Sequence, residues 1–312
     1  MYWPEKEEAA RLLDRLKVPE HDLLAVLELY PDSHEQPGWW PLLLAAHERL
    51  VGNIDQPGDV ELRSADTGDL GLVEPLFGLY VLFSALPDIL QWHRAHEIPE
   101  EISWATLADL GRQVNIYQRF HNQTGCDEYG WLSRHFRGLL FQLGRLQFER
   151  SWIQPQWRSN ADLRESAGPS GRALGIHIPE AGPLSPHLCD ESLAKARTFF
   201  TRHFPDEQYQ LGTCDSWLLD EQLSEYLPPD SNIMRFQRRF TLLPDRLVND
   251  QAVMRFIFYQ NQTVLDDLPQ STSLQRAVVQ HLRDGRHWYT RAGWLRLEAP
   301  ERDRNDVLEK SG

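Results

Sequence analysis

The sequence predicts an α+β protein, in which an all-α N-terminal domain precedes a mixed β-sheet flanked by helices. Apolar residues recur at helical spacing up to about residue 135, and strand-like alternation begins only after about residue 140. Hydrophobic residues make up 41% of the chain and charged residues 25%, which are globular proportions. The 312 residues are enough for two domains. We expect these over 1–135 and 136–297, followed by a charged, disordered tail over 298–312.

The N-terminal domain is predicted to be a series of helices. Leu12, Leu13 and Leu16 belong to an apolar stripe at helical spacing, behind Pro4 and acidic residues that suit a helix start. Further helices are expected over 20–29, 41–50, 71–96 and 100–121, with a loop over 52–69. The segment 132–143 fits either a helix or the start of a strand.

The C-terminal domain is predicted from strands and helices in alternation. Strands are expected over 145–152, 173–179, 209–219, 240–243, 253–259 and 288–297, with a polar loop over 159–171. An amphipathic helix is expected to begin at Ser185, a suitable N-cap followed by Pro186, and to end before Pro205. Thr272 and Gln275 fit a capping box at the start of a later helix. One mixed sheet with flanking helices satisfies this order.

Composition narrows the classes of partner. The net charge is −14 and there is no stripe of basic residues, which disfavours nucleic acid. The three cysteines are far apart and suggest neither a disulfide framework nor a zinc site. His93 and His96 are three positions apart but lack further ligands, so we expect no metal. Prolines and acids interrupt the most apolar stretch, 70–90, so we expect no membrane span. The scattered cysteines and an acidic N-terminus without a long apolar core indicate a cytoplasmic protein. An acidic protein suits a cationic small-molecule substrate such as an amine. The oligomeric state is left open.

Three segments carry a resemblance to a known family: LGIHIPEAGPLSP (174–186), CDSWLLDEQLSEYLPPDSNIMRFQRRF (214–240) and LQRAVVQHLRDGRHW (274–288). They resemble acyltransferases that join an N-acyltransferase N-terminal domain to a GNAT-like C-terminal domain. The resemblance covers most of the chain and is strongest over about 140–295. It implies an acyl-CoA-dependent N-acyltransferase that acts on a small amine. Acetyl-CoA or another acyl-CoA would be the co-substrate, and no metal would be needed.

In GNAT enzymes a strand, a loop and a helix N-terminus bind the pyrophosphate of coenzyme A. The resemblance places this unit at 174–179, at the loop 180–184 and at the helix from Ser185. The implied cofactor-binding residues are Ile178, Gly182, Leu184, Ser185, Arg235 and Arg238. The arginines fit equally well a set of salt bridges to the acidic residues of 220–225.

The loop departs from the family pattern. The usual fingerprint, Arg/Gln-x-x-Gly-x-Gly/Ala, is absent, and Pro183 and Pro186 remove two amide donors. This departure favours an alternative function, a non-catalytic GNAT-like module that binds a small ligand or a protein.

N-acyl transfer requires a base for the amine, donors for the oxyanion and an acid for the leaving thiolate. His177 and Glu180, at the end of the predicted central strand, are candidate bases, and Ser216 and Tyr226 are candidate acids. His177 lies between two isoleucines and also fits a buried, hydrogen-bonded histidine, while Glu180 also fits a solvated loop acid. A third and weaker hypothesis is a hydrolase that uses Cys214 or His177.

Overall fold

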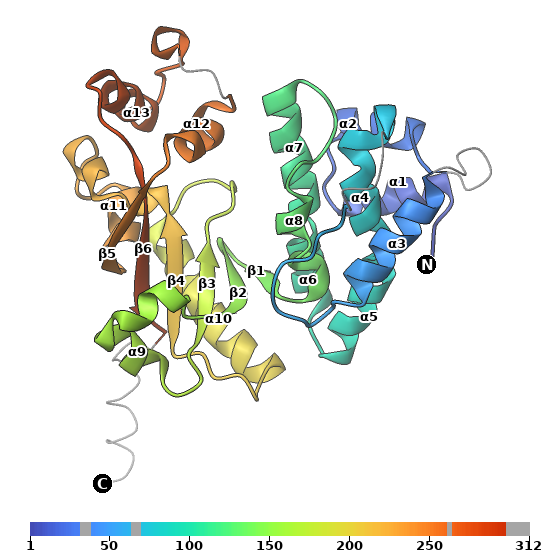
Figure 1. Cartoon of the computed structure of the whole chain (residues 1–312), viewed down its shortest axis with the longest axis horizontal. Helices are drawn as coiled ribbons and strands as arrows, with labels where there is room; N and C mark the ends of the chain where they lie inside the picture. Colours follow the sequence, from blue (N-terminus) through green and yellow to red (C-terminus); the bar gives the residue numbers. More distant parts are fainter. Residues whose placement is uncertain (32–38, 64–69, 261–263, 298–312) are drawn as a thin grey trace. The chain divides into compact units, whose positions relative to one another are not determined.

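The computed structural model describes residues 1–31, 39–63, 70–260 and 264–297 (Figure 1). The chain divides into two compact units, Met1–Gln142 and Leu143–Gly312. The tail expected over 298–312 lies outside the described residues, as does the 64–69 part of the expected loop. Within the described ranges, no helix is long and apolar enough to cross a lipid bilayer.

The first unit is built from helices up to the strand at its end. These are α1 (Lys6–Arg15), α2 (Glu20–Glu28), α3 (Trp40–Val51), α4 (Glu74–Ser84), α5 (Leu86–Ala95), α6 (Glu100–Leu107), α7 (Asp109–His121) and α8 (Tyr129–Leu132). The apolar residues of α4 are buried on all sides, so this helix forms the centre of the unit. The helical segment expected over 71–96 consists of α4 and α5, and the one expected over 100–121 consists of α6 and α7. Pro87 lacks an amide hydrogen and lies in the first turn of α5 instead of continuing α4.

Helix α7 approaches the end of α1 very closely at Gly111. The Gly111 amide donates to the carbonyl oxygen of Leu16 at 3.2 Å. A Cβ at this position would overlap the carbonyl group of Lys17, whose own φ is +64°. Only glycine therefore allows the two backbones to meet here.

His93 of α5 is a buried histidine, with only 1% of its surface exposed. Neither ring nitrogen has a hydrogen-bond partner among the described residues, and the ring of Phe141 lies 5.7 Å away. Burial lowers the pKa of His93 to about 3, and His96 contributes in the same direction. The folded unit therefore holds this ring neutral.

We expect His93 to make the stability of the protein depend on pH. The unfolded chain binds a proton near pH 6.5 and the folded chain only near pH 3, so folding becomes less favourable as the pH falls between these values. The loss is roughly 1.4 kcal/mol per pH unit in that window. In His93→Leu, urea unfolding at pH 4.5, 5.5 and 6.5 should show a slope smaller by about this amount. At pH 8 the ring is neutral in both states, which makes that pH the reference. Equal slopes in the variant and the wild type would contradict the assignment.

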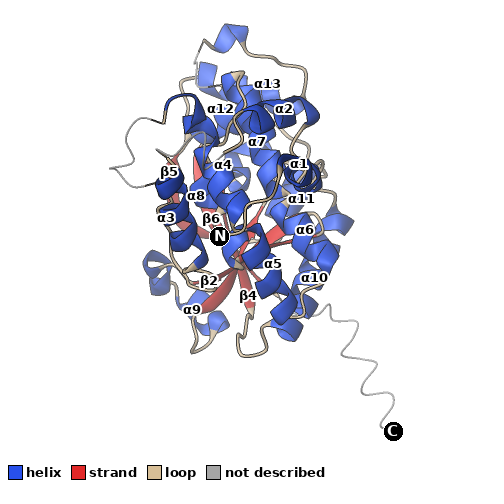
Figure 2. Cartoon of the chain, turned by 90° about the vertical axis from the view of Figure 1, so that its right-hand side faces the viewer, coloured by secondary structure: helices blue, strands red, loops and turns tan. Residues whose placement is uncertain are grey.

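The second unit is organised around a six-stranded mixed sheet of order β1-β2-β3-β4-β6-β5, drawn in red in Figure 2. The strands are β1 (Leu140–Leu143), β2 (Leu146–Trp152), β3 (Arg172–His177), β4 (Leu211–Ser216), β5 (Thr241–Val248) and β6 (Tyr289–Arg296). Helices α9 (Ala161–Ala167), α10 (Pro186–His203), α11 (Asn232–Gln237), α12 (Asp250–Phe258) and α13 (Ser273–Arg283) flank the sheet. The helical N-terminal region and the mixed sheet with flanking helices confirm the predicted fold class.

Two local predictions were wrong. The segment 253–259, expected as a strand, is the end of α12, because the Asn249 side chain accepts the Ala252 amide and starts a helix there. The loop expected over 159–171 contains α9, which Asn160 caps in the same way. The capping box of Thr272 and Gln275 at α13 is confirmed.

The two central strands diverge. β3 and β4 are parallel, and their ladder contains only the pairs Leu174↔Gly212 and Gly175↔Thr213. Beyond these pairs β3 remains paired with β2, and β4 remains paired with β6 up to Ser216. The carboxyl ends of β3 and β4 are therefore held by their outer neighbours and not by each other. We refer to this opening, between 176–177 and 214–216, as the strand fork.

Different helices cover the two faces of the sheet. Arg150 of β2, the register partner of Leu174, stacks at 4.2 Å over the ring of Phe204 at the end of α10, so α10 covers that face. On the opposite face, Leu163 of α9 packs in one apolar cluster with Ala173 of β3 and other residues near the beginning of β3 and β4. Successive strand residues alternate between faces, so Gly175 and His177 lie on the α9 face, nearer the fork.

Candidate functional site

Three ionisable residues meet at the strand fork on the α9 face. His177 is the second residue beyond Gly175 on β3, and Asp215 is the second residue beyond Thr213 on β4. Because Gly175 and Thr213 are register partners, His177 and Asp215 face each other across the fork. Glu149 of β2 is the partner of Gly175 on the other side. The register alone therefore assembles a histidine and two carboxylates.

His177 and Glu149 form a pair. Nε2 of His177 lies 2.9 Å from Oε2 of Glu149, and the two side chains are 30% and 20% exposed. A carboxylate can only accept, so Nε2 carries the hydrogen, and the basic lone pair of the neutral ring is on Nδ1. A Cβ at Gly175 would lie 3.1 Å from Nε2 and 3.3 Å from Cβ of Glu149, which shows how closely the pair packs on this strand.

Asp215 contributes a carboxyl group with a shifted pKa. Desolvation by the surrounding protein raises the pKa of Asp215, and the charge of His177 acts in the opposite direction. As a whole residue Asp215 is exposed, so part of its side chain remains in contact with water. The contribution of His177 to the pKa of Asp215 agrees with their positions across the fork.

Helix α10 begins with unsatisfied amides next to the fork. Ser185 occupies the N-cap position and Pro186 follows, as predicted, but the Ser185 side chain makes no capping hydrogen bond. Among the described residues, the amides of Gly182, Leu184, Ser185, His187 and Leu188 have no hydrogen-bond partner. The N-terminus of an 18-residue helix carries a partial positive charge. Outward-facing amides and this charge together can bind an anion.

Arg145 lies beneath the loop that leads into α10. Its guanidinium donates to three carbonyl oxygens: those of Pro179 at 3.0 Å, Gly182 at 2.7 Å and Pro183 at 3.1 Å. The Ser192 hydroxyl oxygen of α10 accepts the Arg145 backbone amide at 2.7 Å, which fixes the turn between β1 and β2 against the helix. The loop is thus held from below by a single buried side chain.

The arginines near α10 are not equivalent. Arg239 reaches the first turn of α10, where it donates to the Pro186 carbonyl at 3.0 Å and to Asp190 at 2.7 Å. Arg235 instead donates to the Asp230 carbonyl at 2.8 Å, and Arg238 to the Pro229 carbonyl at 2.6 Å. Both therefore brace the 228–231 turn. Arg239 is the member of this basic cluster that lies at the candidate anion site.

Glu180 and Ser216 have local partners. The Glu180 carboxylate accepts the hydroxyl of Tyr259, which follows α12. The Ser216 hydroxyl oxygen accepts the Leu218 amide at 3.1 Å at the end of β4. Ser216 thus stands at the fork on the α10 face, opposite to that of Asp215. Ile178 follows His177 directly and begins the loop.

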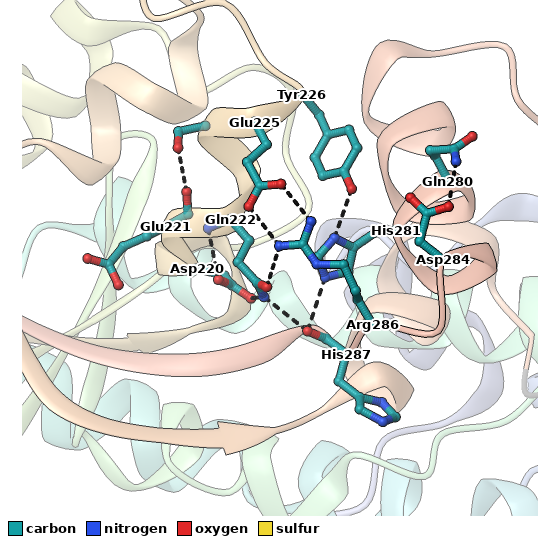
Figure 3. Close-up of polar contacts among 11 residues, drawn as sticks. Asp220, Glu221, Gln222, Glu225, Tyr226, Gln280, His281, Asp284, Arg286 and His287 are labelled. Carbon is teal, nitrogen blue, oxygen red and sulfur yellow. Dashed lines mark hydrogen bonds and ion pairs between the residues drawn. The ribbon is translucent and has the colours of Figure 1, made fainter.

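Tyr226 belongs to a separate polar network (Figure 3). Its hydroxyl lies 3.0 Å from Nδ1 of His281, whose Nε2 lies 3.2 Å from the His287 carbonyl oxygen. Because a carbonyl only accepts, Nε2 carries the hydrogen and Tyr226 donates to Nδ1. Burial lowers the pKa of His281, which agrees with this neutral tautomer. Nearby, Arg286 pairs with both carboxylate oxygens of Glu225. The proton of the Tyr226 hydroxyl is therefore engaged within this network.

Cys214 cannot act as a nucleophile in this environment. It is 2% exposed, and burial raises the pKa of its thiol far above the usual range. It also points to the α10 face of the sheet, whereas His177 points to the other face. In the part of the chain that the structure describes, no group of three or more His, Cys, Asp or Glu side chains is placed to hold a metal ion.

Sequence reasoning missed Glu149, Asp215 as a site residue, and Arg145. Glu149 joins His177 only through the register of β2 and β3, across 28 positions of sequence. Arg145 lies in a tight turn after Gly144, whose φ is +78°, and nothing in the sequence links it to a loop 34 to 38 residues away. The only sequence signal for the pair was that Glu149 and His177 are polar residues within the strands predicted over 145–152 and 173–179.

Both parts of the chain are similar to known acyltransferase domains. The model of the N-acyltransferase N-terminal domain matches residues 7–138, and that of the GNAT-like C-terminal domain matches residues 140–295. No curated protein matches the chain. The crystal structure of an acyltransferase in complex with decanoyl-CoA and teicoplanin is similar, with 37% identity over 95% of this chain and 90% of that chain and a TM-score of 0.82. Two others, an acyltransferase with decanoyl-CoA and one with CoA and 10C-teicoplanin, share 36% identity with the same coverage and TM-score.

Proposed function

Because this chain belongs to the family of acyltransferases that join an N-acyltransferase N-terminal domain to a GNAT-like C-terminal domain, we propose that it transfers an acyl group from acyl-CoA to an amine. The observation that carries the proposal is the juxtaposition of two features at the strand fork. One is the uncapped N-terminus of α10 with its unsatisfied amides, and the other is the pair of His177 and Glu149.

The donor site follows from the anion-binding geometry. The amides of Gly182, Leu184 and Ser185 and the first turn of α10 suit the pyrophosphate of coenzyme A. Arg239 adds a positive charge at the same turn. In the fork, strand edges that are not paired with each other can hydrogen-bond to the amide groups of a pantetheine arm.

The chemistry follows from the histidine pair. The amine nitrogen attacks the thioester carbonyl carbon while Nδ1 of His177 accepts its proton. The tetrahedral intermediate then collapses, the carbon–sulfur bond breaks and the coenzyme A thiolate leaves with the electron pair. The products are an amide and free coenzyme A. Glu149 acts as a positioning residue, because it holds the Nε2 hydrogen and stabilises the imidazolium that forms.

The acceptor of this protein is expected to be larger than a simple alkylamine. The related acyltransferases bind decanoyl-CoA and a glycopeptide. We therefore propose a medium-chain donor and an amine carried by a glycopeptide or a molecule of similar size. The carboxyl group of Asp215 across the fork from His177 would attract the positively charged amine before it loses its proton.

The test has a binding arm and a turnover arm. Decanoyl-CoA, acetyl-CoA and free CoA are titrated into the protein by calorimetry, and thiol release is then followed with a glycopeptide amine, with a simple alkylamine, and with the same glycopeptide after its amine has been acetylated. We expect saturable binding of decanoyl-CoA, and thiol release only with the unblocked glycopeptide. Mass spectrometry should show one added acyl group. No binding and no thiol release at a millimolar concentration of donor would refute the proposal. The alternative function, a non-catalytic GNAT-like binding module, would then be favoured.

A further inference from the structure

We propose that Arg145 is the positioning residue that takes the place of the missing glycine fingerprint, by shaping the 179–184 loop and supplying the positive charge behind it. This inference rests on the proposed function, because the anion that it concerns is the pyrophosphate of the acyl-CoA donor. Arg145 lies in the turn between β1 and β2, outside the strand, loop and helix that make up the expected binding unit.

Arg145 fixes the orientation of the peptide groups in the loop. In a trans peptide the C=O and the following N–H point in opposite directions. The carbonyl of Pro183 points to the guanidinium at 3.1 Å, so the Leu184 amide points away from it. The carbonyl of Pro179 is held in the same way at 3.0 Å. Arg145 therefore turns loop amides outward, which a family member with the usual fingerprint achieves with glycines.

The same contacts explain how the loop accommodates Pro183, which has no amide hydrogen to donate to a phosphate. Its carbonyl and that of Gly182 are both bound by Arg145, and Gly182 has the φ of +81° that the turn requires. The proline costs one amide donor, but its fixed φ stiffens the loop between two anchored carbonyls. The Leu184 and Ser185 amides that follow are the ones without a partner among the described residues.

The buried positive charge of Arg145 is a second reason to expect an anion at this loop. Arg145 is only 9% exposed, and its hydrogen-bond partners are neutral carbonyls. Among the described residues no carboxylate contributes to the pKa of Arg145, which burial lowers. A buried charge without an opposite charge is costly, and such a charge is normally compensated. An anion bound by the loop amides would supply this compensation from the other side of the loop.

The experiment compares two donors that differ only in the part that the loop would bind. Decanoyl-CoA carries the pyrophosphate, whereas decanoyl-pantetheine lacks the pyrophosphate and the nucleotide but presents the same thioester. For Arg145→Met we expect kcat/KM with decanoyl-CoA to fall about 10- to 100-fold, mainly through KM. The value with decanoyl-pantetheine should stay within about twofold of wild type. Arg145→Lys keeps the charge but cannot reach three carbonyls, so its loss should be intermediate.

The outcomes separate the possibilities. If both donors lose efficiency by the same factor, Arg145 is merely structural and the inference is overturned. If Arg145→Met fails to fold, as judged by circular dichroism, Arg145→Lys carries the same comparison of donors. If the wild-type protein uses neither donor, the proposed function fails. If it uses both donors and the substitutions change nothing, the proposed function stands and only the inference about Arg145 fails.

Discussion

Replacing His177 with alanine is expected to lower kcat by about 10²- to 10³-fold, which lies within the contribution of about 10²- to 10⁴-fold typical of a general base. The substitution removes the only histidine at the strand fork, among the described residues, that is paired with a strand carboxylate. It does not touch the α10 N-terminus, so the calorimetric affinity for decanoyl-CoA should stay unchanged. The measurement is steady-state thiol release with a saturating donor.

Glu149→Gln tests the carboxylate of the pair while leaving His177 in place. Glutamine keeps an oxygen near Nε2 but removes the negative charge that stabilises the imidazolium, so we expect a smaller loss of about tenfold in kcat. If His177→Ala retained kcat within about threefold of wild type, His177 would not be the base. Equal losses in the two variants, accompanied by loss of donor affinity, would instead show that the pair only maintains the strand fork.

Gly111→Ala should have the largest effect on stability. The added methyl group would overlap the carbonyl group of Lys17, which is backbone and cannot rotate away, so α1 and α7 would have to separate. Overpacking usually costs 1–3 kcal/mol, and a backbone clash belongs at the upper end, so we expect a loss of about 3 kcal/mol in the free energy of unfolding. This is a large fraction of the total stability of a typical domain. Urea unfolding followed by circular dichroism measures it.

Gly130→Ala is the matched control for this substitution. Gly130 lies in α8 of the same unit, and a Cβ there would meet no atom within 4 Å. Alanine should therefore be neutral, or stabilising by up to about 1 kcal/mol, because it restricts the unfolded chain. If both alanine variants unfolded at the same urea concentration, close approach of α1 and α7 at Gly111 would not be a constraint on the fold.

Local signals in the sequence predicted local structure well. The amphipathic face of α10, the Ser185 N-cap position and the capping box at Thr272 each depend on residues within one or two turns. The errors came from segments with two compatible patterns. Residues 253–259 alternate like a strand, but Asn249 and Asp250 before them favour a helix start, and burial of Val253 and Met254 decides for the helix.

The candidate site was only half accessible from the sequence, because its remaining parts depend on contacts distant along the chain. The resemblance implied Gly182 and Ser185, and His177 was proposed from its position at the end of the predicted central strand. Glu149 could not be predicted, because it reaches His177 only when β2 and β3 pair in one register. The contacts of Arg145 could not be predicted either, because the sequence does not show which carbonyl groups of the loop face its guanidinium. The sequence placed Ser185 at the N-cap position but could not show that its side chain makes no capping hydrogen bond, because that depends on the side-chain rotamer.

The two-pair ladder between β3 and β4 has a mechanical consequence. Strands β1 to β3 come from one continuous stretch of chain and β4 to β6 from a later one, and only these two pairs join them by backbone hydrogen bonds within the sheet. We therefore expect the sheet to bend most easily at this ladder, because only two residue pairs connect its halves. A small rotation there would widen or narrow the fork while the longer ladders on either side stay intact.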